Sequence, residues 1–272
     1  MALVGVMSCD GQSKPPARDA KTPSEVEAKD PAPPLAVGQP KSGPEPTGRA
    51  KPTPEIKPKP APPADFGHAD LDPGNDQVLG PPEPLADCES RLADAGVVWK
   101  KGKLKLKDKR EGVYTCGSHQ AVWVKGGRAG IRYSSSPLLS CPMAIALADF
   151  EQIVQEEAQR HFGVNVERID FMSTYACRKM ARFDMISEHS FANAIDIRRF
   201  RLEGKKTVDV LDDFHPEQDD TKDPKALFLR IVANRLYDEN VFSTVLTPYF
   251  DRLHRNHFHL DLARYRVDGS RP

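Results

Sequence analysis

Two short stretches in the last third of the chain combine histidine and carboxylate residues at spacings that suit a metal site. In the first, His189 is followed seven positions later by Asp196; in the second, His254, His257 and His259 lie within six residues. Two neutral imidazoles and one carboxylate are a common ligand set for catalytic Zn²⁺, with a fourth position open for water. Zinc lowers the pKa of that water to near neutrality, so that it can attack an amide carbonyl.

Apolar residues alternate with the polar ones in both stretches. If the second stretch is a strand, His257, His259 and Asp261 share one face and the apolar residues between them face the core. Asp196 lies between two isoleucines, so its carboxylate also points away from the core, while His189 reaches the site from a preceding loop. Either stretch alone is more often an ordinary polar surface. Together they predict that these side chains converge on a metal site.

The elements that must position these residues follow from apolar periodicity. Helical spacing predicts helices over residues 85–95 and from 143 to a stop near Gly163. A cap followed by a first-turn proline, Asp223 and Pro224, predicts a third helix through about Asp238. Strands are predicted at residues 99–107, 121–124, 164–171, 241–246 and 257–262. Because helices and strands mix without a regular βαβ repeat, we expect an α+β domain.

Five cysteines occur in the 272 residues, and four of them, Cys88, Cys116, Cys141 and Cys177, belong to the C-terminal part. An even number in one domain favours two disulfides and an oxidising compartment. Zinc-bound or buried free thiols are the alternative, although no CxxC pair occurs. Sequence alone leaves three possible pairings open.

The N-terminal third has a different composition from the rest. Residues 1–9 resemble a shortened bacterial lipoprotein signal in which Cys9 is lipidated. The alternative is an ordinary N-terminus. Compared with a normal signal, the stretch has no basic residue and a short apolar core, and a start codon assigned too late would explain both. Residues 10–84 are rich in proline, lysine and glutamate, which predicts a disordered linker that provides reach. A proline-rich ligand for a small recognition domain is the second interpretation. No apolar run could cross a bilayer, so a lipid on Cys9 would be the membrane attachment.

The formal net charge of +0 gives no reason to expect nucleic acid as a partner. One local basic stretch, residues 99–107, alternates lysine with apolar residues. This pattern favours a half-exposed strand over a binding site for a polyanion.

The motif Ser-x-His-x6-Asp, followed by His-x2-His-x-His, resembles zinc peptidases of the D-Ala-D-Ala carboxypeptidase and endopeptidase group, which share a fold with the Hedgehog signalling domain. More closely, the chain resembles the extensin-like C-terminal family of bacterial envelope proteins. The matching stretches are residues 175–178, 187–197, 242–248 and 254–262. The resemblance covers about Leu85 to Leu262. It implies a domain over residues 85–272 with a central antiparallel sheet flanked by helices.

The same resemblance implies a role for each matching residue. His189, Asp196 and His259 match the zinc ligands of the group. His257 and His254 match histidines that handle protons during catalysis.

Two further positions match substrate-binding ones, Arg178 and Ser187, and Arg178 is also expected to polarise the substrate. Two positions depart from the pattern. Asn256 replaces the glutamate base of the carboxypeptidases, which moves proton transfer onto His257 or His254. Ala192 replaces a usual glycine, at an expected small cost.

The resemblance implies a zinc-dependent hydrolase of peptide bonds in peptidoglycan. Together with the signal-like N-terminus, it implies a location in the bacterial envelope, periplasmic and lipid-anchored. The alternative is a non-catalytic domain that keeps the fold for wall binding or scaffolding. A third interpretation is a peptidase for a soluble substrate that carries D-amino acids or a free C-terminus.

Overall fold

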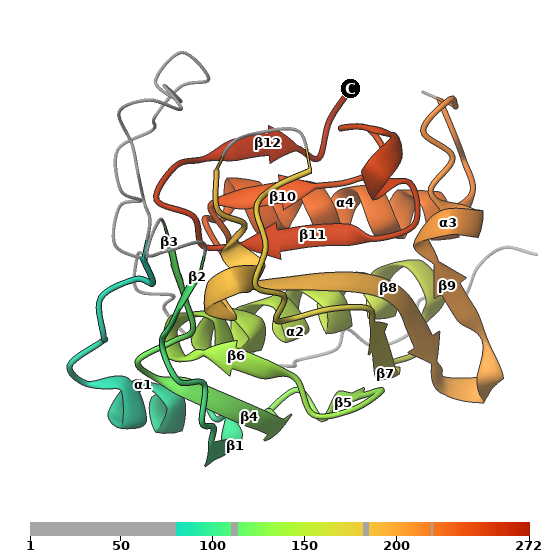
Figure 1. The fold of residues 1–272 in the computed structure, drawn as a ribbon. Coiled ribbons are helices and arrows are strands. Elements are labelled where there is room, and N and C mark those ends of the chain that lie inside the picture. Colours follow the sequence, from blue (N-terminus) through green and yellow to red (C-terminus); the bar gives the residue numbers. More distant parts are fainter. Residues whose placement is uncertain (1–79, 110–113, 182–184, 219) are drawn as a thin grey trace, which may run out of the picture. The chain divides into compact units, whose positions relative to one another are not determined.

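The computed structural model describes residues 80–109, 114–181, 185–218 and 220–272 (Figure 1). The lipidation prediction at Cys9 and nearly all of the predicted linker lie outside these residues. The α-helices are α1 (Cys88–Asp94), α2 (Cys141–Phe162), α3 (Val210–Asp213) and α4 (Pro224–Asp238), and the 3-10 helices are η2 (Glu188–Phe191), η3 (Glu203–Lys205) and η4 (Arg252–His254). No helix in the described part of the chain is both long and apolar enough to cross a bilayer.

Within the described residues the strands form three sheets, and the largest carries the candidate site. They are β1 (Val98–Lys101), β2 (Lys107–Lys109), β3 (Tyr114–Cys116), β4 (Ala121–Gly126), β5 (Arg132–Tyr133), β6 (Leu138–Ser140), β7 (Val166–Phe171), β8 (Ala194–Leu202), β9 (Thr207–Asp209), β10 (Thr244–Leu246), β11 (Phe258–Asp261) and β12 (Val267–Gly269). The seven-stranded sheet has the order β12-β10-β11-β8-β7-β5, with β9 paired to β8; the others are β1-β4-β6 and β2-β3.

Helices and sheets mix as the sequence predicts, so the α+β class is confirmed. The expectation of an antiparallel sheet is correct only for its centre. Strands β10, β11, β8 and β7 pair antiparallel, whereas β12 joins β10 and β5 joins β7 in parallel. The sheet is therefore mixed. Each edge strand is separated in sequence from the strand that it pairs with, so neither edge pair is a hairpin.

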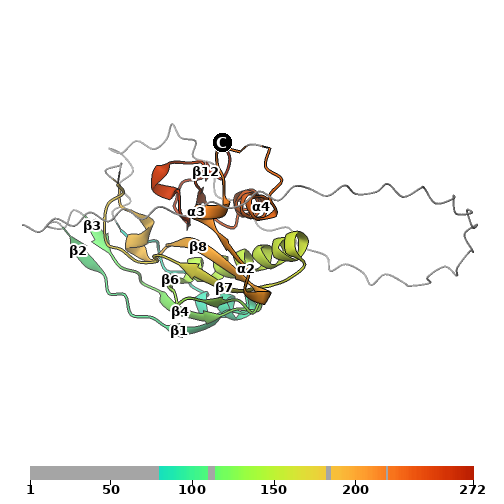
Figure 2. The ribbon, with the colours of Figure 1, turned by 90° about the vertical axis from the view of Figure 1, so that its right-hand side faces the viewer.

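The two long helices form where the sequence places them. The Ser140 hydroxyl accepts the backbone N–H of Met143 at the start of α2, and Gly163 ends the helix with a left-handed φ of 66°. The Asp223 carboxylate accepts the N–H of Lys225 at the start of α4. Both helices contribute to one apolar core with the sheet, and Figures 1 and 2 show them on the same side of β8.

Two predictions of local structure need correction, and several strands were not predicted. Helix α1 begins at Cys88, three residues later than predicted. The strand predicted over residues 99–107 forms only as β1 and as the first residue of β2; residues 102–106 are irregular, because the alternate apolar side chains find no core and Leu106 is 45% exposed. Strand β12 lies beyond every predicted element.

Two disulfides join the four cysteines of the domain, as expected, and the structure resolves their pairing. Cys88–Cys141 ties α1 to the start of α2, with a Cα–Cα distance of 6.1 Å, and Cys116–Cys177 ties β3 to the loop before η2, at 5.6 Å. They bridge 53 and 61 residues. Cross-links of that span stabilise a fold by about 4 kcal/mol in the chain-entropy picture.

Candidate metal centre

Strands β8 and β11 present two of the predicted ligands from adjacent positions. His259 lies directly opposite Asp196 in the antiparallel register, so both side chains project from one face of the sheet. The residues on either side of them are fully buried on the helix-covered face: Ile195, Ile197, Phe258 and Leu260. The predicted arrangement, an apolar back and a polar front, is therefore the one observed.

The 3-10 helix η2 brings His189 to the same place. It ends at Ala192, whose φ of 55° and ψ of 29° are left-handed, and the N–H of Ala192 returns to the His189 carbonyl at 3.2 Å. A left-handed conformation favours glycine and costs another residue on the order of 1 kcal/mol. Glycine therefore suits position 192 because its φ is positive, and alanine is tolerated there because the cost is small.

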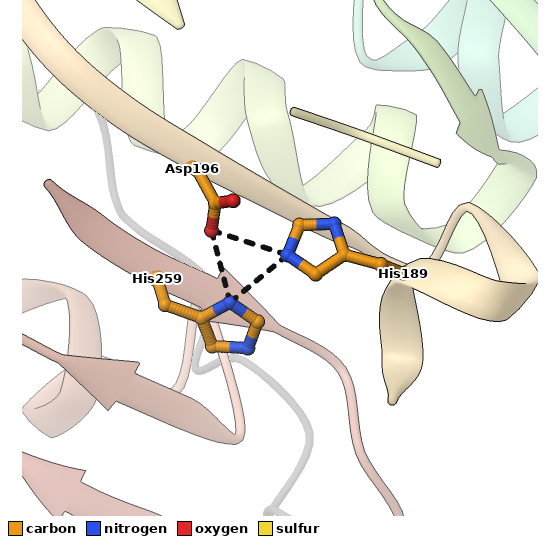
Figure 3. Close-up of side chains that lie close together, drawn as sticks. All are labelled: His189, Asp196 and His259. Carbon is orange, nitrogen blue, oxygen red and sulfur yellow. Dashed lines mark hydrogen bonds and ion pairs between the residues drawn. The ribbon is translucent and has the colours of Figure 1, made fainter. Parts of the chain in front are cut away.

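Three atoms form a nearly equilateral triangle at the centre of the site (Figure 3). Nε2 of His189 lies 3.1 Å from Oδ1 of Asp196 and 3.2 Å from Nδ1 of His259, and the last two atoms are 3.1 Å apart. Tetrahedral zinc with bonds of roughly 2.0–2.1 Å separates its ligand atoms by about 3.3 Å. The spacing and the donor types therefore fit a zinc ion.

Protons alone cannot satisfy this triangle. The two ring nitrogens supply at most two protons, and two N–H groups cannot bond to each other, so one of the three short contacts stays unfavourable. A cation in contact with all three lone pairs removes the conflict. The chemistry of the donor set thus points to a metal ion rather than to a hydrogen-bonded cluster.

Asp261 orients the third ligand. Nε2–H of His259 donates to Oδ2 of Asp261 at 2.8 Å, which leaves the Nδ1 lone pair directed at the triangle. Burial lowers the pKa of His259, but hydrogen bonds to Asp196 and Asp261 outweigh it and raise the value to about 10. For Asp196, burial raises the pKa, yet both histidines hold it well below its usual range. A metal ion would bind here by displacing the proton from Nδ1 of His259, and the two carboxylates that favour the proton also favour the cation.

Sequence reasoning assigned no role to Asp261, although its position two residues after His259 was the available signal. The other orienting contact is missing for His189: its buried Nδ1 has no hydrogen-bond partner among the described residues.

Two further histidines border the triangle, each oriented by a neighbour. Nε2 of His257 lies 3.6 Å from Oδ1 of Asp196, while its Nδ1–H donates to the Asn256 side chain at 2.9 Å. Burial lowers the pKa of His257 to about 4, against the opposing charge of Asp196, so the ring is neutral with a free Nε2. Asn256, the departure from the glutamate pattern, thus fixes the tautomer of His257.

His254 has a carboxylate partner that sequence reasoning missed. Its Nδ1 donates to Oδ1 of Asp251 at 2.7 Å, and its ring lies 5.3 Å from that of His257. Burial lowers the pKa of His254, although Asp251 opposes the shift. Asp251 also caps η4 by accepting the N–H groups of Leu253 and His254, so the pattern Asp-x-x-His at a helix start was the signal.

A cavity of about 540 Å³ opens onto one side of the triangle. Asp196 and His259 lie at its wall beside His254 and His257, whereas His189 is beneath the surface and only 1% exposed. The apolar residues that line it are Met180, Ala181, Met185, Leu246, Phe250, Leu253 and Val267. A space of this size beside the ligand atoms suits a substrate rather than a structural ion alone.

Both residues predicted to bind substrate line this cavity. Arg178 is exposed at the rim, where its guanidinium contacts the Lys179 carbonyl at 3.3 Å. Ser187 is buried in the wall, just before η2. Arg178 and Ser187 are linked through the backbone, with the Ser187 N–H bonded to the Arg178 carbonyl at 3.2 Å.

Asn193, which sequence reasoning overlooked, ties the pieces of the site together. Its Oδ1 accepts the Ser140 hydroxyl at 2.9 Å, and its Nδ2 donates to Glu188 at 2.8 Å and to the Leu262 carbonyl at 2.9 Å. One fully buried side chain thereby connects the start of α2, the helix that carries His189 and the end of β11. Burial and the charge of Asp261 raise the pKa of Glu188 to about 7.

Comparison with known proteins gives one match. A family model described as Extensin-like protein C-terminus matches residues 86–270, which begins one residue after the predicted domain start and includes β12. No curated protein and no solved structure matches the chain.

Proposed function

We propose that this chain, which belongs to the extensin-like protein C-terminus family, is a zinc-dependent hydrolase of peptide bonds in peptidoglycan. The observation that carries the proposal is the triangle of His189, Asp196 and His259 on the wall of a substrate-sized cavity. A structural zinc site is normally closed by four protein ligands, whereas this set has three and an open side.

The neighbouring residues supply what peptide hydrolysis needs. His189, Asp196 and His259 would hold a zinc ion, which would supply Lewis acidity to lower the pKa of water and to polarise an amide carbonyl. His257 accepts a proton at Nε2, because its Nδ1–H is held by Asn256. The leaving amine takes up the proton that His257 received, and His254, whose Nδ1–H is held by Asp251, lies beside His257 to relay it. Arg178 and Ser187 bind the substrate at the cavity rim and wall.

The finer fold relationship and the location belong to the same proposal. The ligand pattern supports a relation to the D-Ala-D-Ala carboxypeptidases and endopeptidases and to the Hedgehog fold. The two disulfides support an oxidising compartment such as the periplasm. A lipid on Cys9 would tether the domain, and the proline-rich segment over residues 10–84 would let it reach the wall.

One observation favours the non-catalytic alternative. Asn256 replaces the carboxylate base of the carboxypeptidases, so proton transfer depends wholly on histidine. A domain that keeps the zinc site for stability and binds the wall without cleaving it would share the same ligand triangle.

The test uses the full chain, secreted into an oxidising compartment, with zinc measured by mass spectrometry and muropeptide release from purified sacculi measured by chromatography. We expect about one zinc ion per chain and release of cleaved stem peptides. His189→Ala abolishes both, whereas His119→Ala, at an exposed histidine outside the cavity, changes neither. A folded protein without zinc, or equal release by both variants, contradicts the proposal. Zinc and wall binding without release identify the non-catalytic alternative.

A further inference from the structure

The small sheet β1-β4-β6 has an outward face that belongs to no site described so far. Val122 and Val124 of β4 enter the core, whereas Trp123 and Lys125 between and beyond them point outward. Trp123 lies directly opposite Lys100 of β1 on one side and Leu138 of β6 on the other. The outward row across the three strands is thus lysine, tryptophan and leucine.

This face is apolar and basic at once. Val98 is 61% and Trp123 39% exposed, two of the few large apolar side chains in the described chain that remain in water. Six of the twelve residues from 98 to 109 are lysine, and one, Asp108, is acidic. No described residue forms an ion pair with any of these lysines. We call Val98, Lys100, Trp123 and Lys125 the basic aromatic face.

The sequence pattern alone favoured a half-buried strand for this stretch. That interpretation accounts for β1, but residues 102–106 are not strand and Leu106 is exposed. Trp99 packs against the core, but beyond it the lysines and apolar residues of this stretch are not explained by a strand that is buried on one side. None of the residues of the basic aromatic face lines the cavity beside the metal centre, so the two surfaces are separate.

We propose that the basic aromatic face binds an anionic glycan strand of the cell wall. The indole ring of Trp123 offers a flat apolar surface to the C–H bonds of a sugar ring. Lys100 and Lys125 lie beside it in position to pair with carboxylates carried by the polymer. The choice of a wall polymer rests on the proposed function, whereas the face itself rests on exposure and charge.

The shape of the face distinguishes a glycan from a membrane surface. Trp123 is on the middle strand of three, and most of its side chain is covered by its neighbours. A residue in that position presents a flat platform, whereas insertion into lipid requires side chains that project from a loop or helix.

The platform is also preformed. The Cys88–Cys141 disulfide ties α1, just before β1, to α2, just after β6. A surface held in this way loses little conformational entropy when it binds a partner.

The test measures binding of the full chain to purified sacculi by co-sedimentation, in the presence of a zinc chelator so that cleavage does not interfere. We expect Trp123→Ala to weaken binding by about tenfold or more, as loss of a central tryptophan does at other interfaces. Trp123→Phe retains a ring and loses less. The double variant Lys100→Glu/Lys125→Glu weakens binding and flattens its salt dependence.

Matched controls are Leu211→Ala, at an exposed apolar residue of α3, and Lys205→Glu/Lys206→Glu, at exposed lysines of the β8–β9 turn. Both should bind sacculi as the unaltered chain does. Near-ultraviolet circular dichroism checks that every variant is folded.

Equal binding by Trp123→Ala and the unaltered chain overturns the proposal. Tighter binding to phosphatidylglycerol vesicles or to duplex DNA than to sacculi, lost in the same variants, also overturns it and assigns the face to lipid or nucleic acid. Release of soluble muropeptides is measured separately. A chain that binds through Trp123 but releases nothing refutes the proposed hydrolase and leaves the glycan surface intact.

Discussion

The two faces of the seven-stranded sheet are held by different forces. The face under α2 and α4 is packed with aromatic rings, among them Phe150, Phe200 and Phe228, whose contacts are non-directional. The opposite face buries polar groups around the candidate metal ligands, and each depends on a partner at a fixed distance, as Asn193 does. The apolar face should therefore set stability and the polar face chemistry, and each can be perturbed without the other.

The largest expected effect is on the polar face. His257→Ala removes the proposed proton acceptor, whose Nε2 lies 3.6 Å from Asp196, and we expect kcat to fall by about 10²–10⁴-fold, the range for loss of a general base. The zinc content should stay unchanged, because His257 is not a ligand. Steady-state cleavage of isolated muropeptides measures kcat, and metal analysis measures the zinc content. A kcat within twofold of the unaltered chain removes His257 from the mechanism.

The apolar face gives the reverse result. Phe228 packs against Phe200 and Phe162, with ring centroids 5.3 Å apart in both pairs. We expect Phe228→Ala to lower the free energy of unfolding by roughly 3–5 kcal/mol in urea titrations, while zinc affinity is unchanged. Phe228→Leu is the matched control and should cost less. Zinc affinity that falls in parallel with stability would show that the two faces are not independent.

Asn193→Ala tests where the two faces meet. The change leaves the Ser140 hydroxyl, the Glu188 carboxylate and the Leu262 carbonyl without this partner, at a cost on the order of 2–3 kcal/mol in unfolding free energy. Because Glu188 precedes His189, zinc affinity should fall as well. Asn165→Ala also removes two side-chain hydrogen bonds, with Gln159 and Glu203, but at an exposed site where water replaces them, so it should cost less than about 1 kcal/mol. Unaltered zinc binding in Asn193→Ala would mean that η2 is positioned by other contacts.

A buried acid on the apolar side gives a pH test. Burial raises the pKa of Glu151 from 4.5 to about 7, although a hydrogen bond from Tyr133 at 2.8 Å lowers it. The folded state then binds the proton more tightly than the unfolded state. Stability from this group is complete below about pH 4.5 and declines as pH rises to about 7, by up to roughly 3 kcal/mol. Glu151→Gln should remove this decline.

The check is the unfolding free energy at pH 5 and pH 8 for both proteins. Other titrating groups are common to the pair, so the difference between the two pH dependences reports Glu151. Parallel pH profiles would show that Glu151 has an ordinary pKa in the folded protein.

The same contrast explains what could be predicted from sequence. Helix α2 follows from apolar periodicity and its stop at Gly163, and α4 from periodicity and its cap at Asp223, because burial and helix ends leave local patterns. Alternation around Asp196 and His259 likewise placed both on one face of the sheet. The convergence of Asp196 and His259 was predictable because each lies between apolar residues. His189, which reaches the site from a loop, was placed by its spacing from Asp196 and by the family resemblance.

Other features depend on contacts between distant segments and left no local pattern. The disulfides and the parallel pairing of β12 join residues more than twenty positions apart. The three hydrogen bonds of Asn193 connect separate elements. Asp251 and Asp261 were within reach, since each lies two or three residues from the histidine that it orients. The irregular path of residues 102–106 could not be predicted, because alternation of polar and apolar residues does not reveal whether a core lies against the apolar side chains.

The central claim is that His189, Asp196 and His259 hold one zinc ion, and anomalous diffraction at the zinc edge tests it most directly. Crystals of the full chain grown with zinc should show a single strong anomalous peak within roughly 2.0–2.2 Å of Nε2 of His189, Oδ1 of Asp196 and Nδ1 of His259. The peak should be absent in crystals of His189→Ala. A folded chain with no peak at this triangle, or with its zinc bound elsewhere, would contradict the account.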